Sequence, residues 1–201
     1  DNRLCLLDPG PLDEVQFMNF MKAIGDRKLD YLLITHTHAD HSPAALKIQA
    51  ETGAELVGMP APDVPGHDRT FQPTRAWKHG DEIDCGEYKI RLIHTPGHVS
   101  NHVCYLLRET KILFTGDHVL QGTTSVILPP DGSMRDYLKS LDLLRSESIN
   151  FLAPGHGRIM DEPIKEIDSL IAHRLKREGK IFERLKALGI CNLERLVSAA
   201  Y

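Results

Sequence analysis

One short segment of the chain brings three histidines and one carboxylate within six residues. His36 and His38 follow the apolar run 31–34, which predicts a buried strand, and alternate side chains of an extended chain point to the same side. Asp40 and His41 come next, at the expected entrance of a helix. Such closely placed groups would repel and desolvate one another without a cation, and imidazole and carboxylate both suit zinc. The spacing therefore predicts two neighbouring metal positions, one with His36 and His38 and one with Asp40 and His41, against the alternative of a polar loop with surface histidines.

The two residues after His41 are typical of a helix start, with Ser42 as the N-cap and Pro43 at the first helical position. We expect this helix to cover 43–52 and to end at Gly53. Its N-terminus would add positive partial charge near the metal positions, which favours a phosphate or a carboxylate.

Three further apolar runs are expected to be strands that end close to a histidine or an aspartate. The runs at 88–93, 111–114 and 149–153 lead into His98, Asp117 and His156, respectively. Because open α/β sheets collect their chemistry at the carboxyl ends of strands, we expect these side chains to join the first segment at one edge of the fold.

The remaining elements must position these strand ends. We expect strands at 3–7, 56–57 and 103–107, a turn at 8–11, and helices at 15–24 and after Ser133. The segment 58–76 is rich in proline and poor in pattern, which predicts a surface loop, and its His67 is expected to be solvated.

Composition fits an ordinary water-soluble globular protein, with 201 residues, 41% hydrophobic and 26% charged. Apolar runs stay well below the roughly 18 residues that span a bilayer, and the first residues do not resemble a signal peptide. The four cysteines are scattered without a close pair in sequence, which favours neither a thiolate zinc site nor a disulfide framework. We therefore expect a cytoplasmic protein without a membrane partner.

Charge is distributed unevenly along the chain. The net charge is −4, but residues 173–186 hold six Lys or Arg against two Glu, which gives this segment +4 and the rest −8. The segment is either a footprint for nucleic acid or the solvated face of a helix whose apolar stripe packs. That stripe consists of Ile167, Leu170, Ile171, Leu175, Phe182 and Leu185.

The set of motifs resembles the metallo-β-lactamase-fold hydrolases over about residues 1–160. The matching motifs are His36-x-His38-x-Asp40-His41, His98 in Thr-Pro-Gly-His, Asp117 in Thr-Gly-Asp and His156 in Pro-Gly-His-Gly. The resemblance implies an α/β fold, an αββα sandwich with two Zn²⁺ at one edge of two facing sheets. It also implies that His36, His38 and His98 hold one zinc, that Asp40, His41 and His156 hold the second, and that Asp117 bridges them.

Within this superfamily the chain looks most like the lactamase-β-like-2 group. The resemblance implies a metal-hydrolase domain at 1–162 and a C-terminal helical region at 163–201, the start of a winged-helix-like extension. That group normally has further strands before the equivalent of Asp1 and continues past the equivalent of Tyr201. The bridging Asp117 disfavours a lactam substrate, because the true β-lactamases lack this carboxylate.

The resulting functional hypothesis is a dinuclear zinc hydrolase that uses a metal-bridging hydroxide, with Asp40 as the residue that steers the hydroxide or shuttles a proton. Characterised members of the group include endoribonucleases, so a phosphodiester of single-stranded RNA is the leading substrate and a small-molecule substrate the other. A small ester or thioester hydrolase of glyoxalase II type is an alternative, although the Cys-Gly-Arg segment usual after the bridging aspartate is absent here. A mononuclear iron oxygenase of persulfide type, with two histidines and one aspartate, and a binding module are the other classes.

Several further residues are candidates for weaker roles. His102, His118 and Arg158 are expected to contact substrate or to support the ligands from behind. We expect His79 and His173 to be surface groups and His94 to be a core or strand histidine.

Overall fold

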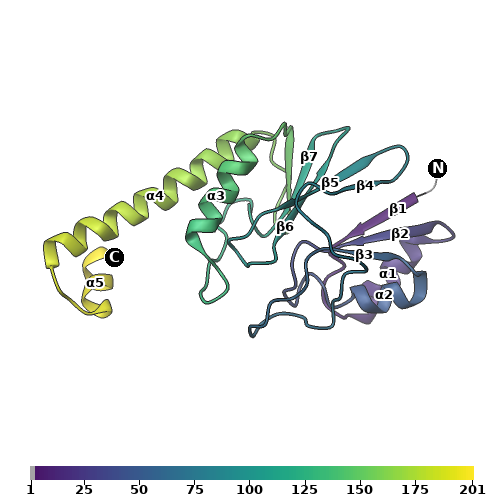
Figure 1. Cartoon of the computed structure of the whole chain (residues 1–201), viewed down its shortest axis with the longest axis horizontal. Helices are drawn as coiled ribbons and strands as arrows, with labels where there is room; N and C mark the ends of the chain where they lie inside the picture. Colours follow the sequence, from purple (N-terminus) through teal and green to yellow (C-terminus); the bar gives the residue numbers. More distant parts are fainter. Residues whose placement is uncertain (1–2) are drawn as a thin grey trace. The chain divides into compact units, whose positions relative to one another are not determined.

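Two β-sheets pack face to face in the first of the two units into which the chain divides (Figure 1). The structure is a computed structural model that describes residues 3–201. The first unit extends to Pro163 and the second runs from Ile164 to Tyr201.

The first sheet is parallel and has the order β1-β2-β3. Its strands are β1 (Arg3–Leu7), β2 (Lys28–Leu33) and β3 (Glu55–Val57), connected by the helices α1 (Glu14–Ile24) and α2 (Ala45–Thr52). Parallel neighbours need a crossover, and each of these helices supplies one.

Alternation along β2 explains why this strand lies at the centre of the fold. Leu32 and the following Ile34 pack in a core with residues of the two helices, such as Phe17 and Ile48. Leu33 points the other way and packs in the core between the two sheets. The end of β2 is therefore buried on both faces, and this packing holds the start of the segment that carries His36 to His41.

The second sheet is mixed and has the order β4-β5-β6-β7-β8, with an antiparallel arrangement from β4 to β7 and β8 parallel to β7. Its strands are β4 (Glu82–Asp84), β5 (Lys89–His94), β6 (Val103–Leu107), β7 (Ile112–Gly116) and β8 (Phe151–Pro154). Helix α3 (Met134–Arg145) lies on the side of this sheet away from the first sheet, which completes the expected αββα order (Figure 1).

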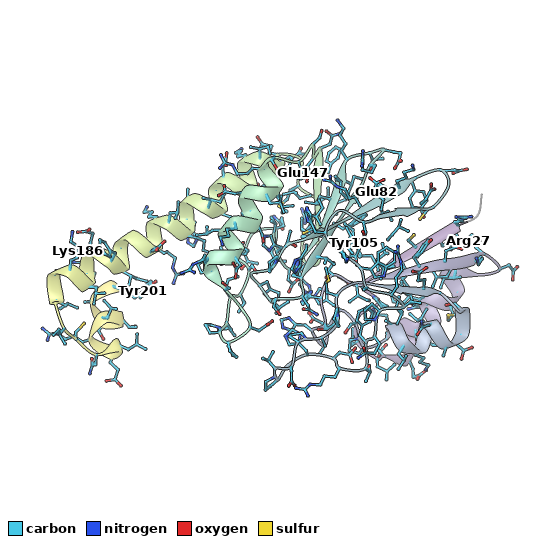
Figure 2. All side chains as sticks on the ribbon, viewed as in Figure 1. Arg27, Glu82, Tyr105, Glu147, Lys186 and Tyr201 are labelled. Carbon is cyan, nitrogen blue, oxygen red and sulfur yellow. The ribbon has the colours of Figure 1, made fainter. Side chains whose placement is uncertain are left out.

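Tyr105 ties the two sheets together. It comes from β6, is fully buried, and points between the sheets (Figure 2). Its hydroxyl donates to the carbonyl oxygens of Ile34 at 2.8 Å and Val57 at 3.1 Å, both at the carboxyl ends of strands in the first sheet. A buried hydroxyl needs such partners, and here they set the height of one sheet against the other.

The sequence predictions for most elements of the first unit are confirmed. The strand at Arg3–Leu7 and the helix start at Ser133, which accepts from the backbone N–H of Asp136, match the structure. The predicted start of α2 is wrong, because the helix begins at Ala45 without a side-chain cap. Ser42 instead donates its hydroxyl proton to Asp68 at 2.7 Å, a tertiary contact that the local pattern does not reveal. Strand β4 was not predicted, and it has a single buried side chain, that of Ile83.

The second unit contains helix α4 (Pro163–Leu188), most of which belongs to it, and helix α5 (Leu193–Ala200). Asn192 caps α5 by accepting from a backbone N–H. The guanidinium of Arg177 donates to the hydroxyl of Tyr201 at 2.7 Å, which holds the end of the chain against α4. Among the described residues there is no helix with the length and apolar character that a membrane span needs.

The expected apolar stripe of α4 is only partly packed. Ile167 is fully buried, whereas Leu175, Phe182 and Leu185 are 50%, 56% and 43% exposed. Of the two interpretations left open by the sequence, a packed apolar stripe therefore fits Ile167 but not the second half of the helix.

Candidate metal centre

The predicted ligands gather where four strands end, after β2, β5, β7 and β8. In the first cluster the ring nitrogens of three histidines converge. His36 Nε2 lies 3.0 Å from His38 Nδ1, and His98 Nε2 lies 3.1 Å from the same atom. These three residues come from two loops that are 60 positions apart in sequence, so packing of the two sheets creates the cluster.

The second cluster contains one carboxylate and two imidazoles. Asp40 Oδ2 lies 3.2 Å from His156 Nε2 and 3.5 Å from His41 Nε2. His41 is buried, whereas Asp40 and His156 are about half exposed on their side chains. The cluster is thus open on one side.

Asp117 lies between the two clusters and offers one carboxylate oxygen to each. Its Oδ1 is 3.5 Å from both His41 Nε2 and His156 Nε2, while its Oδ2 is 3.8 Å from His98 Nε2. This is the arrangement that a bridging carboxylate requires. The structure therefore brings all seven predicted ligands together in two adjoining sets.

The donor atoms fit metal cations. Within the described part of the chain, His41 Nε2 and Asp117 Oδ1 are buried side-chain atoms without a hydrogen-bond partner, a costly situation that a cation would relieve. The set of imidazole nitrogens and carboxylate oxygens is one that zinc binds, although the same donors also suit iron. The half-exposed side chains of Asp40 and His156 leave this side of the site in contact with solvent.

Asp8 supports both clusters, and sequence analysis missed it. Its Oδ2 lies 2.8 Å from His41 Nδ1 and also accepts from the hydroxyl of Thr35 at 2.7 Å, while its Oδ1 accepts from the Thr35 backbone N–H at 2.8 Å. The Thr35 hydroxyl is in turn 3.0 Å from His36 Nδ1. Because Thr35 donates to Asp8, it accepts from His36, and the proton on Nδ1 leaves Nε2 free for a metal.

His98 and His102 are oriented by partners of their own. His98 Nδ1 donates to the carbonyl oxygen of Val126 at 2.5 Å, which again directs Nε2 into the cluster. His102 is fully buried, and its Nε2 accepts from the backbone N–H of Asp117 at 3.2 Å while its Nδ1 lies 2.9 Å from the Thr95 hydroxyl. His102 therefore holds the backbone of the bridging residue.

The other two weak candidates lie in different surroundings. His118 is fully buried, its ring lies 4.7 Å from that of Tyr137, and both of its ring nitrogens lack a hydrogen-bond partner within the described residues. It is thus shielded from solvent and from a substrate. Arg158 is exposed, two positions after His156.

His67 contradicts the expectation that it is solvated. Only 2% of its side-chain surface is exposed, its Nδ1 lies 2.8 Å from the Thr37 hydroxyl, and its Nε2 lies 3.3 Å from Asp131 Oδ2. The ring lies 5.0 Å from that of His38. His67 therefore connects the loops 58–76 and 119–132 next to the predicted ligand His38. The sequence of its own segment has no pattern that predicts this role.

The electrostatics of the site set which imidazoles carry a proton. Burial, reinforced by neighbouring histidines, lowers the pKa of His36 well below its usual value and that of His38 to about 4. Burial also acts to lower the pKa of His41, but the negative charges of Asp117 and Asp8 and the hydrogen bond with Asp8 outweigh it and raise that pKa to about 10. Without a cation, His41 thus holds a proton that compensates the negative charges of Asp8 and Asp117.

Comparison with known proteins agrees with this arrangement. The sequence profile of the Metallo-beta-lactamase superfamily matches residues 1–156. The chain is similar to the Beta-lactamase-like protein 2 homolog of Drosophila melanogaster, with 30% identity over 90% of this chain and 64% of that protein. It is also similar to Thioesterase pkgB of Emericella nidulans, with 32% identity over 83% of this chain and 45% of that protein.

Similarity extends to solved structures. The crystal structure of a metallo-beta-lactamase family protein from Thermus thermophilus superimposes with a TM-score of 0.72 at 18% identity, covering 91% of this chain and 73% of that one. The chain spans less than two thirds of the length of the two curated relatives. The sequence profile matches more than half of the chain, and the two facing sheets and the ligands at the strand ends agree with it. The chain therefore belongs to the metallo-beta-lactamase superfamily.

Proposed function

We propose that the protein is a dinuclear metal-dependent hydrolase. The observation that carries this proposal is the position of Asp117, whose two carboxylate oxygens face two separate sets of histidines. A mononuclear site would need one set only, and a binding module would have no reason to keep both.

His36, His38 and His98 would hold one metal, Asp40, His41 and His156 the other, and Asp117 both. When bound, two zinc ions would supply Lewis acidity towards a substrate oxygen and make hydroxide available as a nucleophile near neutral pH. The side chain of Asp40 is 54% exposed, so it can exchange a proton between the site and solvent and pass one to a leaving group.

Metal analysis tests the proposal directly. Protein purified without added metal should contain close to two zinc per chain, measured by elemental analysis against protein concentration. About one iron per chain without zinc would instead support the oxygenase alternative, in which two histidines and one aspartate hold a single iron.

For the substrate, we infer a phosphodiester of single-stranded RNA as the first candidate. The basic segment of α4 supports it, because a chain with a net charge of −4 concentrates +4 there. The second candidate is a thioester, which the similarity to a protein named as a thioesterase favours. Against the thioester, His118 and Val119, which directly follow Asp117, are both fully buried and do not offer their side chains to a thiol carrier.

A matched substrate panel separates the two candidates. The metal-loaded protein should cleave a single-stranded RNA oligonucleotide and a small phosphodiester faster than an acyl thioester, at equal protein and substrate concentrations. Faster thioester hydrolysis, lost in Asp117→Ala, would replace the first candidate with the second while leaving the dinuclear hydrolase intact.

A further inference from the structure

Two cysteines that are far apart in sequence meet between the two sheets. Cys5 Sγ lies 3.2 Å from Cys85 Sγ, across a separation of 80 residues. Cys5 belongs to β1 of the first sheet, and Cys85 follows β4 of the second. The predicted ligands lie instead after the ends of β2, β5, β7 and β8, so this thiol pair is a separate feature of the fold.

The backbone on both sides of the pair is irregular. The pairing of β1 with β2 shifts register between Leu4 and Cys5. Cys85 begins the turn that joins β4 to β5, where its N–H donates to the Tyr88 carbonyl at 2.9 Å. A disulfide needs its sulfurs about 2.05 Å apart, so each sulfur has to move by roughly half an ångström. A bulge and a turn can absorb that movement without breaking a regular strand ladder.

The surroundings of the pair are polar enough to hold a thiol and closed enough to protect a disulfide. The Tyr88 hydroxyl donates to Cys5 Sγ at 3.6 Å, and Arg3 donates to the Asp84 carbonyl at 3.3 Å beside it. Cys85 is buried and Cys5 is half-buried. Cys5 is thus the thiol that a small reagent reaches first, and Cys85 is placed to resolve the product.

We propose that Cys5 and Cys85 are a reversible redox site whose disulfide links the two sheets of the fold. With a peroxide as oxidant, the Cys5 thiolate attacks one peroxide oxygen and becomes a sulfenic acid while the other oxygen leaves and takes up a proton. Cys85 sulfur then attacks Cys5 sulfur, forms the S–S bond and releases water. Two thiols lose two electrons, and one hydrogen peroxide becomes two molecules of water.

Burial raises the pKa of Cys5 to about 12, which keeps the thiolate scarce at neutral pH. The two thiols should therefore be oxidised slowly, during a sustained exposure to oxidant. The equilibrium between thiols and disulfide is a better measure of the site than the rate of oxidation. Once formed, the disulfide would close a loop of 80 residues that contains the ligand segment from His36 to His41, so it restricts the unfolded chain strongly.

The test uses the full chain with its metals, equilibrated in glutathione buffers from reducing to oxidising, then blocked with an alkylating reagent and mapped by mass spectrometry. We expect a peptide pair joined through Cys5 and Cys85, the loss of two hydrogen atoms from the intact mass, and full reversal by dithiothreitol. The melting temperature of the oxidised protein should rise by roughly 5–10 °C. Wild-type protein alone gives this comparison, so it does not depend on how well a variant folds.

Single variants provide the controls. Cys5→Ser and Cys85→Ser should each abolish the linked peptide and the shift in melting temperature, whereas Cys191→Ser should retain both. Cys191 is half-buried in the second unit and reports on general thiol reactivity. If Cys5 and Cys85 both remain alkylated in buffers that oxidise Cys191, or if the shift persists in Cys5→Ser, the proposal is overturned.

Discussion

The carboxylate of Asp117 occupies the position on which both halves of the metal site depend. Its two oxygens lie within 3.5–3.8 Å of histidine nitrogens from both sets, and its backbone N–H is fixed by the buried ring of His102. Its own pKa results from opposing effects, because burial raises it and the nearby positive charge of His41 lowers it by more, with a net decrease. Asp117 is therefore ionised at neutral pH, as a metal ligand has to be.

Removing this carboxylate should affect both metals together. In Asp117→Ala we expect the metal content to fall below one per chain and hydrolysis to fall by about 100-fold or more, while the circular dichroism spectrum stays close to wild type because the apolar strands carry the core. Asp142→Ala, in which an exposed aspartate of α3 is removed, is the matched control and should change neither quantity. If the Asp117→Ala variant keeps two metals per chain and full turnover, Asp117 is not a metal ligand.

Asp8 should act through the residues that it holds. In Asp8→Asn the partner of His41 Nδ1 changes from an anion to a neutral amide, so zinc affinity should fall by about 10–100-fold. Competition with a zinc chelator measures this directly. Asp63→Asn changes an aspartate whose side chain is 95% exposed and should bind zinc like wild type. Equal affinities in Asp8→Asn and Asp63→Asn would contradict the support that we assign to Asp8.

Zinc binding should also release a proton from His41. The raised pKa of about 10 means that His41 is charged at neutral pH in metal-free protein, whereas His36 and His38, whose pKa values are lowered, are already neutral. A ligand must be deprotonated, so affinity should rise with pH through this range, and His41 should contribute one released proton per chain. Calorimetry in two buffers of different protonation enthalpy counts the protons. Asp8→Asn, which loses one of the two carboxylates that hold this proton, should release fewer, and an unchanged count would contradict this assignment.

At the scale of elements, helix α3 fixes the loop that carries His98. Ser140 of the helix donates to the Pro96 carbonyl at 2.7 Å, and Gly97 packs directly against the helix backbone. A Cβ on Gly97 would lie 2.4 Å from the Cα of Tyr137, and Gly97 also has a positive φ of 150°. Packing at this point therefore admits only glycine.

Gly97→Ala and a control substitution should distinguish the effect of a steric clash with α3 from the effect of backbone strain at a positive φ. We expect it to lower the free energy of unfolding by about 2–4 kcal/mol and to weaken metal binding, because α3 and the His98 loop must move apart. Gly122→Ala is the matched control, since Gly122 has a positive φ of 74° but nothing within 4 Å of its added Cβ. It should lose only about 1 kcal/mol. Urea unfolding compares the two, and equal losses would mean that the contact with α3 contributes little.

The sequence was informative about elements and about ligands for a physical reason. Strand alternation and helical periodicity are local, and a histidine or aspartate just beyond a strand end has a position that the strand determines. Asp8 was expected to be part of a turn, and its role depends on His41, which lies 33 residues further on. His67 depends on Thr37, 30 residues away, and Cys5 depends on Cys85. These contacts form only when the two sheets and their loops pack together, so no local sequence pattern predicts them.

At the scale of the whole molecule, the second unit carries a concentration of positive charge, whereas the predicted metal ligands belong to the first unit. The basic residues of 173–186 lie on α4, where the neighbouring apolar side chains of Leu175 and Phe182 are also exposed. A helix that packed its apolar stripe would not expose it in this way, so the solvated-face interpretation explains this part of α4 less well. Proteins that bind single-stranded nucleic acid combine basic side chains along the backbone with aromatic side chains on which bases stack, so the RNA proposal predicts a role for this segment.

Salt dependence tests whether this segment binds RNA. If it contacts phosphates, each Lys or Arg contact releases counterions, and the affinity for single-stranded RNA should fall steeply as salt rises. Replacing Arg174, Arg177 and Arg184 together by Gln should reduce the slope of log affinity against log salt by about 2, at roughly 0.7 per contact. Zinc content and hydrolysis of a small phosphodiester should stay unchanged, because these residues lie outside the first unit.

The matched control neutralises three exposed lysines of the first unit, Lys22, Lys28 and Lys78, which lowers the net charge of the chain by the same amount. If only net charge matters, both triple variants reduce the slope equally. If the α4 segment is the footprint, the slope falls in the arginine variant and stays at the wild-type value in the lysine variant. Because Arg177 also holds Tyr201, the circular dichroism spectrum of the arginine variant must first match wild type. Identical slopes for wild type and the arginine variant would exclude the segment as the RNA footprint and shift the substrate assignment towards the thioester.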